Sequence, residues 1–321
     1  MTLRPIAAML LGGFLVACGT VEPRPRTNND SLIAGQPLPA RTVFPPGTDW
    51  NRDVSADSVD IDSDSLIAHC GAAAALHPDF GTWYQGALWG IPFATVDSTQ
   101  PRVPVSFSYA SESDPGPYPI PPNVPIEGGS ASTGDRHVIV VDVDAWKLYE
   151  LFDARPVNGG ASWTAGSGAV FDLATGALRP DGWTSADAAG LPIFAGLARY
   201  DEAVTTGAIT HALRFTCPVT RRAYVPPARH EAGSTNSVYA PPMGMRVRLK
   251  VSVDISGYPA EDRVMLQALK TYGMYVADNG GPFFLSGAPD PRWNDANIDQ
   301  LKQIHGSDFE VVRMTGLVVP P

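Results

Sequence analysis

Four side chains suited to acid–base chemistry occupy turn positions in the second half of the sequence. We predict catalytic roles for Asp181, Asp187, His230 and Asp278. Hydrolysis of a glycosidic bond needs one carboxyl group with a raised pKa and a second carboxylate across the scissile bond. Elimination from a uronic acid instead needs a base such as histidine. These residue types therefore fit either kind of sugar chemistry.

Further polar and aromatic side chains accompany these four and are predicted to bind substrate. They are Arg214, Arg229, His211, Asn279, Trp183 and Trp293. Arginine or asparagine can neutralise a sugar carboxylate, and the tryptophan ring offers a flat face to a sugar. His211 and Arg214 lie three apart in a strand-like run, so only one of them can face a cleft. The alternative is that each cluster only stabilises a turn or caps a helix.

Asp278 is the strongest of the catalytic candidates because of its neighbours. Met274–Ala277 is expected to be a buried strand, and Asp278 follows where that strand reaches the surface. The next residues, 279–281, are Asn-Gly-Gly, which carry little bulk and permit a sharp bend. The alternative role for this carboxylate is to hold the bend by accepting a backbone hydrogen bond.

Several function classes are excluded by composition and by missing motifs. The chain of 321 residues has 23 basic and 33 acidic residues, which argues against a protein that tracks nucleic-acid phosphates. No glycine-rich loop of the nucleotide-binding type occurs. His230-Glu231 begins like a zinc-binding helix, but Ser234 stands where the second histidine is required. We therefore expect no nucleotide, no cofactor and no metal.

The N-terminus carries an export signal. Ile6–Val16 is an uninterrupted run of apolar residues and glycine, too short to span a membrane. It ends in Leu15-Val16-Ala17-Cys18, which resembles the lipobox of bacterial lipoproteins. The resemblance implies that residues 1–17 are a signal peptide and that Cys18 receives the lipid. Because Gly19 rather than aspartate follows, it also implies anchorage to the outer membrane.

Two cysteines remain once Cys18 is assigned to the lipid. In an oxidising compartment, Cys70 and Cys217 are expected to form a disulfide. The alternative is two free, buried thiols.

The rest of the sequence indicates a tethered, mainly β body. Residues 18–50 are rich in proline and are expected to form an extended tether, followed by one globular domain over residues 51–321. Many short strand-like runs with turn-rich connections favour a β-sandwich or jelly-roll. Two late helices are expected at about 259–272 and 295–305. The proline-rich segment 114–129 is expected to be a surface loop bordering a binding site.

Segments spread over the body resemble secreted bacterial proteins of uncharacterised function. They include Gly134-Asp-Arg-His-Val138, His211-Ala-Leu-Arg-Phe215 and Ala277-Asp-Asn-Gly280. The resemblance implies no activity. Two hypotheses therefore stand. The first is an envelope-anchored enzyme acting on polysaccharide, as a hydrolase or a lyase. The second is a non-catalytic lipoprotein that binds a glycan or a protein.

Overall fold

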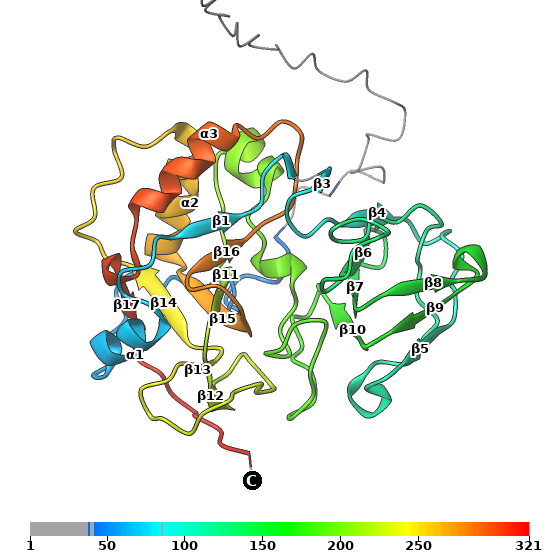
Figure 1. Cartoon of the computed structure of the whole chain (residues 1–321), viewed down its shortest axis with the longest axis horizontal. Coiled ribbons are helices and arrows are strands. Elements are labelled where there is room, and N and C mark those ends of the chain that lie inside the picture. Colours follow the sequence, from blue (N-terminus) through cyan, green and yellow to red (C-terminus); the bar gives the residue numbers. More distant parts are fainter. Residues whose placement is uncertain (1–37, 39–41, 85, 321) are drawn as a thin grey trace, which may run out of the picture. The chain divides into compact units, whose positions relative to one another are not determined.

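Short β-strands dominate the computed structural model, which describes residues 38, 42–84 and 86–320 (Figure 1). The predicted mainly β, sandwich-like fold is confirmed. The predicted signal peptide 1–17, Cys18 and the tether up to residue 37 lie outside the described residues. Within the described part of the chain, no helix is both long enough and apolar enough to cross a membrane.

The larger sheet has six strands in the order β1-β16-β11-β15-β14-β17 (Figure 1). Their bounds are β1 (His77–Asp79), β11 (Leu213–Cys217), β14 (Arg246–Leu249), β15 (Met274–Asn279), β16 (Phe284–Ser286) and β17 (Phe309–Val311). The pairs β1–β16 and β11–β15 are parallel, and the other neighbours are antiparallel. Because β11 and β15 are parallel, their carboxyl ends lie side by side, and Asp278 is at the carboxyl end of β15.

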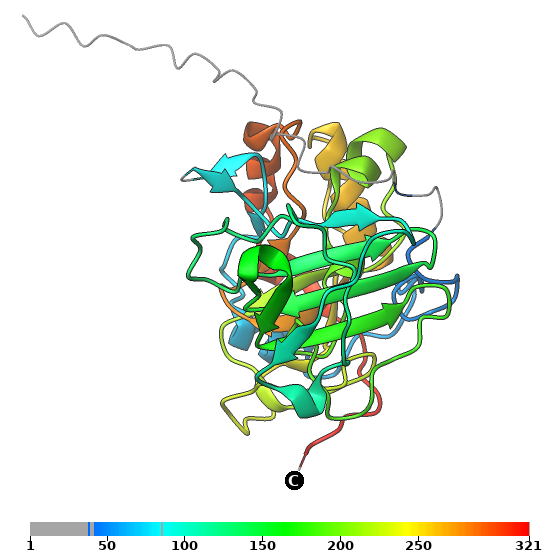
Figure 2. The same ribbon diagram turned by 90° about the vertical axis from the view of Figure 1, so that its right-hand side faces the viewer.

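A second sheet of four strands has the order β10-β7-β6-β4, and a three-stranded sheet has the order β5-β9-β8 (Figures 1 and 2). Their bounds are β4 (Ala94–Val96), β5 (Val105–Phe107), β6 (Val138–Asp142), β7 (Lys147–Phe152), β8 (Arg155–Val157), β9 (Ser162–Ala165) and β10 (Ser167–Asp172). Two further ladders join β2 (Trp83–Tyr84) to β3 (Ala87–Leu88) and β12 (Arg221–Tyr224) to β13 (Pro242–Met243).

The four-stranded sheet is buried on both faces, which explains the apolar run of β6. Ile139 and Val141 belong to the larger hydrophobic core, shared with the six-stranded sheet. Val138 and Val140 point the other way, into a smaller core that also contains Trp163 of the three-stranded sheet. Side chains alternate between the faces of a strand, so β6 must be apolar at both sets of positions.

The two late helices are present, with one difference. Helix α2 (Ala260–Thr271) nearly matches the prediction, and it buries Met265, Leu266 and Leu269 in the larger core. The second predicted helix is divided into α3 (Asp295–Ile298) and a 3₁₀ segment, Asp299–Gln303. The remaining 3₁₀ turns are Ala110–Glu112, Asn158–Gly160, Phe194–Gly196 and Gly306–Asp308, and a π-helical turn spans Asp201–Thr206.

Two features near the start of the body correct the sequence interpretation. Helix α1 (Ser63–Cys70) precedes the two predicted helices and was not expected. Val43, Phe44 and Trp50 are buried in the larger core, so the end of the predicted tether, residue 50, was placed several residues too late.

The predicted disulfide is confirmed. Cys70 ends α1 and Cys217 ends β11, and the two residues are bonded, with their Cα atoms 5.2 Å apart. The alternative of two free thiols is therefore wrong.

Candidate functional site

A cavity of about 460 Å³, here called the acidic cavity, lies where strand ends of the six-stranded and the four-stranded sheets meet. Asp278 and Asn279 reach it from the end of β15, Phe152 from the end of β7 and Ser167 from the start of β10. Its lining includes four acidic residues and one histidine: Glu112, Asp135, Asp187, Asp278 and His230. Three of the four residues predicted to be catalytic therefore meet in one place.

Asp278 presents a carboxyl group to the acidic cavity. Its Oδ1 accepts a hydrogen bond from the backbone N–H of Asn279 at 2.7 Å, while Oδ2 has no hydrogen-bond partner among the described residues. Burial raises the pKa of Asp278 above its usual value, and the nearby Arg214 guanidinium opposes that rise. A half-buried carboxyl group with a raised pKa and one free oxygen is suited to donate a proton.

Asp187 belongs to the cavity lining, but its side chain is 0% exposed, so a ligand cannot contact its carboxylate directly. Its Oδ1 accepts from the backbone N–H of Ala189 at 2.8 Å, and its Oδ2 accepts from Arg214 Nη2 at 2.9 Å. Burial raises the pKa of Asp187 to about 7; Arg214 opposes this rise and the nearby Asp278 adds to it. With both oxygens engaged, Asp187 is a positioning residue, which corrects its predicted direct catalytic role.

Arg214 is also buried and lies behind the cavity lining. Besides its contacts to Asp187, its Nη1 donates to Ser286 Oγ at 2.7 Å. A substrate cannot reach this guanidinium, so the prediction that Arg214 binds substrate directly is wrong. The arginine instead fixes Asp187 and places a positive charge near Asp278.

We expect replacement of Arg214 by methionine to lower the free energy of unfolding by about 3 kcal/mol. The change leaves the Asp187 carboxylate buried without its partner. Urea unfolding monitored by circular dichroism measures the loss. The double variant Arg214→Met/Asp187→Leu removes both charges and should recover most of it. Equal stability of Arg214→Met and the wild type would contradict this account of the pair.

His230 is oriented by a backbone carbonyl. Its Nδ1 lies 2.8 Å from the Ala188 oxygen, and because a carbonyl only accepts, Nδ1 must carry the proton of that bond. Its Nε2 faces Glu112 Oε2 at 3.8 Å. His230 can therefore exchange a proton through Nε2 with Glu112 or with a ligand in the acidic cavity.

The loop before Asp187 is held against the His230 segment. Gly190 has a φ of +71°, and a Cβ there would lie 2.6 Å from the Trp183 carbonyl oxygen, so only glycine fits. Arg229 bridges the two segments, because its Nη2 contacts Asp181 Oδ1 at 3.0 Å and its Nε donates to the Arg179 carbonyl. Asp181 and Arg229 therefore pair with each other, and neither lines the acidic cavity.

The other predicted binding residues fall into two groups. Asn279 lines the acidic cavity, although its amide also bonds Thr220 and the Ala232 carbonyl. The Trp183 ring stacks with the Arg179 guanidinium outside the cavity lining. His211 is buried and contacts Glu202 at 3.0 Å, and Trp293 is only 5% exposed and packs on Phe80 and Tyr200. The predictions that His211 and Trp293 bind substrate are therefore wrong.

A charged cluster that the sequence did not reveal supports one side of the acidic cavity. His137 Nδ1 contacts Glu127 Oε2 at 2.6 Å, and its Nε2 contacts the carbonyl of Ala186, a lining residue. Burial alone would lower the pKa of His137, but the Glu127 carboxylate outweighs it and raises the pKa to about 9. Side-chain atoms of Glu127, Asp135 and His137 lie within 4.8 Å of one another, a spacing that would suit a metal ion. Both ring nitrogens of His137 are already engaged, one by the Glu127 carboxylate and the other by the Ala186 carbonyl, which is the arrangement of an imidazolium ion that donates two hydrogen bonds.

Glu112 and Asp135 are the cavity residues that sequence reasoning missed. Glu112 lies two residues before the proline-rich segment 114–129, and Asp135 lies three residues before the start of β6. The prediction that the proline-rich segment borders a binding site was the nearest signal in the sequence, although none of residues 114–129 lines the acidic cavity.

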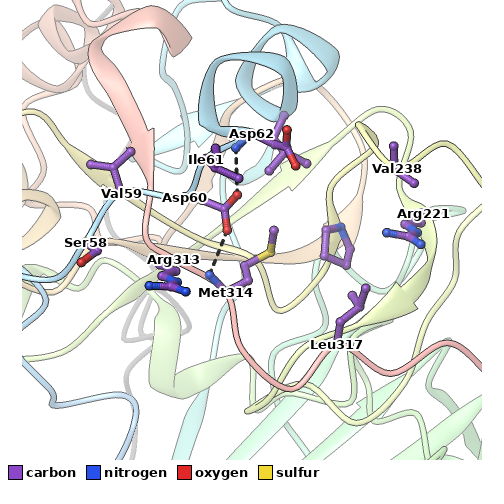
Figure 3. A pocket seen from close by; sticks show the side chains of 12 residues that line it. Ser58, Val59, Asp60, Ile61, Asp62, Arg221, Val238, Arg313, Met314 and Leu317 are labelled. Atoms are coloured by element: carbon purple, nitrogen blue, oxygen red, sulfur yellow. Dashed lines mark hydrogen bonds between the residues drawn. The ribbon is translucent and has the colours of Figure 1, made fainter.

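A second cavity, of about 600 Å³, lies beside α1 and offers less for catalysis (Figure 3). Its Asp60 carboxylate accepts hydrogen bonds from the backbone N–H groups of Asp62 and Met314, so it holds a turn (Figure 3). The lining also includes Arg221, Arg313 and exposed apolar side chains. The acidic cavity therefore remains the candidate site.

Comparisons with protein-family models, with curated proteins and with solved structures each found no match for this chain.

Proposed function

We propose that the acidic cavity hydrolyses glycosidic bonds in a polysaccharide, with Asp278 as the general acid. The observation that carries the proposal is the Asp278 carboxyl group, which lines the cavity with a raised pKa and a free Oδ2. A proton donor of this kind is what departure of a sugar oxygen requires.

Asp135 is the second carboxylate of the proposed mechanism. It lines the same cavity, it is exposed, and its charge acts on Asp278. An ionised carboxylate opposite the acid either activates a water molecule or attacks the sugar ring. Asp187 and Arg214 serve as positioning residues beneath the pair.

Hydrolysis is favoured over uronate elimination by the charges around the cavity. None of the lining residues in the described part of the chain is a lysine or an arginine, whereas four are acidic. A uronate carboxylate would enter this site without a lysine or arginine in the lining to neutralise it. We therefore propose a neutral or amino-sugar polysaccharide as the substrate.

A panel of glycans tests this proposal. The chain without residues 1–18 is incubated with neutral, amino-sugar and uronate-containing polysaccharides, and both reducing ends and absorbance from unsaturated uronates are recorded. Release of reducing ends from a neutral or amino-sugar glycan is expected. Unsaturated products would instead indicate a lyase. Binding without any release would favour the second candidate, a glycan-binding lipoprotein, which the exposed aromatic side chains Trp83 and Tyr84 also fit.

We also propose that this protein is a lipoprotein anchored through Cys18. Replacing Cys18 by alanine is expected to move the protein from the membrane fraction to the soluble fraction of the cell envelope, because acyl chains supply about 0.8 kcal/mol per buried methylene. Immunoblots of separated fractions measure the shift. Gly19→Asp is the matched variant, expected to keep the protein on a membrane but to move it from the outer to the inner one. Retention of Cys18→Ala on the outer membrane would contradict lipid anchorage.

A further inference from the structure

Exposed aromatic side chains gather around the short β2–β3 ladder. Trp83 is 48% exposed and Tyr84 is 59% exposed, and they are consecutive residues of β2, so they point to opposite faces. The Tyr84 ring lies 5.8 Å from the Trp89 ring, centroid to centroid. Tyr84 therefore offers an exposed ring beside a second aromatic ring.

Tyr84 and Trp89 line a cavity of about 330 Å³, here called the aromatic cavity. The Trp89 ring is fixed, because its Nε1 donates to Asp79 Oδ1 at 3.1 Å and its edge contacts His77. His77 in turn stacks on Phe284 at 4.1 Å. Asp79 and Glu127 also line the cavity and supply carboxylate oxygens that accept hydrogen bonds.

The aromatic cavity and the acidic cavity lie on either side of one charged cluster. Glu127 lines the aromatic cavity and Asp135 lines the acidic cavity. Their carboxylate oxygens and a ring nitrogen of His137 all lie within 4.8 Å of one another. The two cavities are therefore neighbours, close enough for different units of one oligomeric ligand to occupy both.

We propose that the aromatic cavity is a distal subsite that binds sugar rings of the same glycan whose bond is cleaved beside Asp278. The Tyr84 and Trp89 rings offer apolar faces to the C–H face of a pyranose, and Asp79 and Glu127 accept hydrogen bonds from its hydroxyl groups. The carboxylates repel acidic sugars, so the subsite selects neutral or amino-sugar chains. This inference rests on the proposed function for its substrate class, and it adds that the substrate is an oligomer rather than a disaccharide.

Binding to a protein that cannot turn over its ligand tests the subsite. In the Asp278→Asn background, affinities for cello- and chito-oligosaccharides, from disaccharide to hexasaccharide, are measured by isothermal titration calorimetry. Tyr84→Ala is expected to weaken hexasaccharide binding about tenfold, the equivalent of one lost ring contact, and to leave disaccharide binding unchanged. Tyr84→Phe should retain the affinity because it keeps the ring.

Tyr239 supplies the matched control. It is 49% exposed and lines neither cavity, so Tyr239→Ala should bind both ligands as the parent does. Equal hexasaccharide affinity of Tyr84→Ala and its parent would overturn the subsite, even if the wild type cleaves glycans. A length-dependent loss in Tyr84→Ala would support it, even if the wild type cleaves nothing and the proposed hydrolysis fails.

Discussion

Replacement of Asp278 by asparagine is expected to lower the rate of glycan cleavage at least about 100-fold, while the melting temperature stays nearly unchanged. The asparagine side-chain oxygen can still accept the hydrogen bond from the Asn279 N–H, so the end of β15 keeps its conformation. The asparagine cannot, however, donate the proton that the departing sugar oxygen takes up. The loss of rate is measured from initial rates of both proteins on the best glycan of the panel, and the melting temperatures are measured by thermal unfolding.

The pH dependence of the wild-type rate provides a second readout of the same carboxyl group. A general acid works in its protonated form, which persists up to its pKa, and burial raises the pKa of Asp278. The alkaline limb of the rate profile should therefore lie above the ordinary aspartate range, and it should be absent from the residual activity of Asp278→Asn.

Asp172 offers a matched control for the asparagine substitution. It also ends a strand, β10, and its Oδ1 accepts hydrogen bonds from the backbone N–H groups of Ala174 and Thr175. It does not line the acidic cavity. Asp172→Asn should therefore retain full activity. A folded Asp278→Asn protein that is as active as Asp172→Asn would remove Asp278 from the mechanism.

Removal of the Cys70–Cys217 disulfide is expected to cost about 4–5 kcal/mol of unfolding free energy. The bond joins residues 147 positions apart, and in the chain-entropy model a long closed loop restricts the unfolded chain most. It also ties α1 to the end of β11, two elements that share the larger core.

The double variant Cys70→Ala/Cys217→Ala measures this contribution by urea unfolding. The wild type with added reductant should approach the stability of the variant, whereas reductant should leave the variant itself unchanged. Equal midpoints for the oxidised wild type and the double variant would show that the disulfide does not limit stability.

Local patterns account for the features that sequence reasoning predicted. Helix α2 follows from a proline at its start, apolar residues at helical spacing and Gly273 just beyond its end. The disulfide follows from counting cysteines in an exported chain. The apolar run of β15 stops just before Asp278, which predicts that this residue lies at a strand end.

Side-chain burial and long-range pairing account for what the sequence could not reveal. Trp293 and His211 have residue types that suit sugar binding, yet the fold surrounds the first with aromatic rings and pairs the second with Glu202. Glu112 and Asp135 meet Asp278 only because strand ends of two different sheets converge, and no local pattern encodes that convergence. Asp187 has the residue type of a catalytic carboxylate, but the fold pairs it with Arg214 from another element.

The mass of the products formed from a neutral oligosaccharide tests the central claim most directly. Purified wild type and Asp278→Asn are incubated in parallel with the hexasaccharide, and the products are identified by mass spectrometry. The account predicts that each cleavage by the wild type adds the mass of one water molecule, and that the variant leaves the hexasaccharide intact over the same time. Products that lack the added water, or equal cleavage by both proteins, would contradict it.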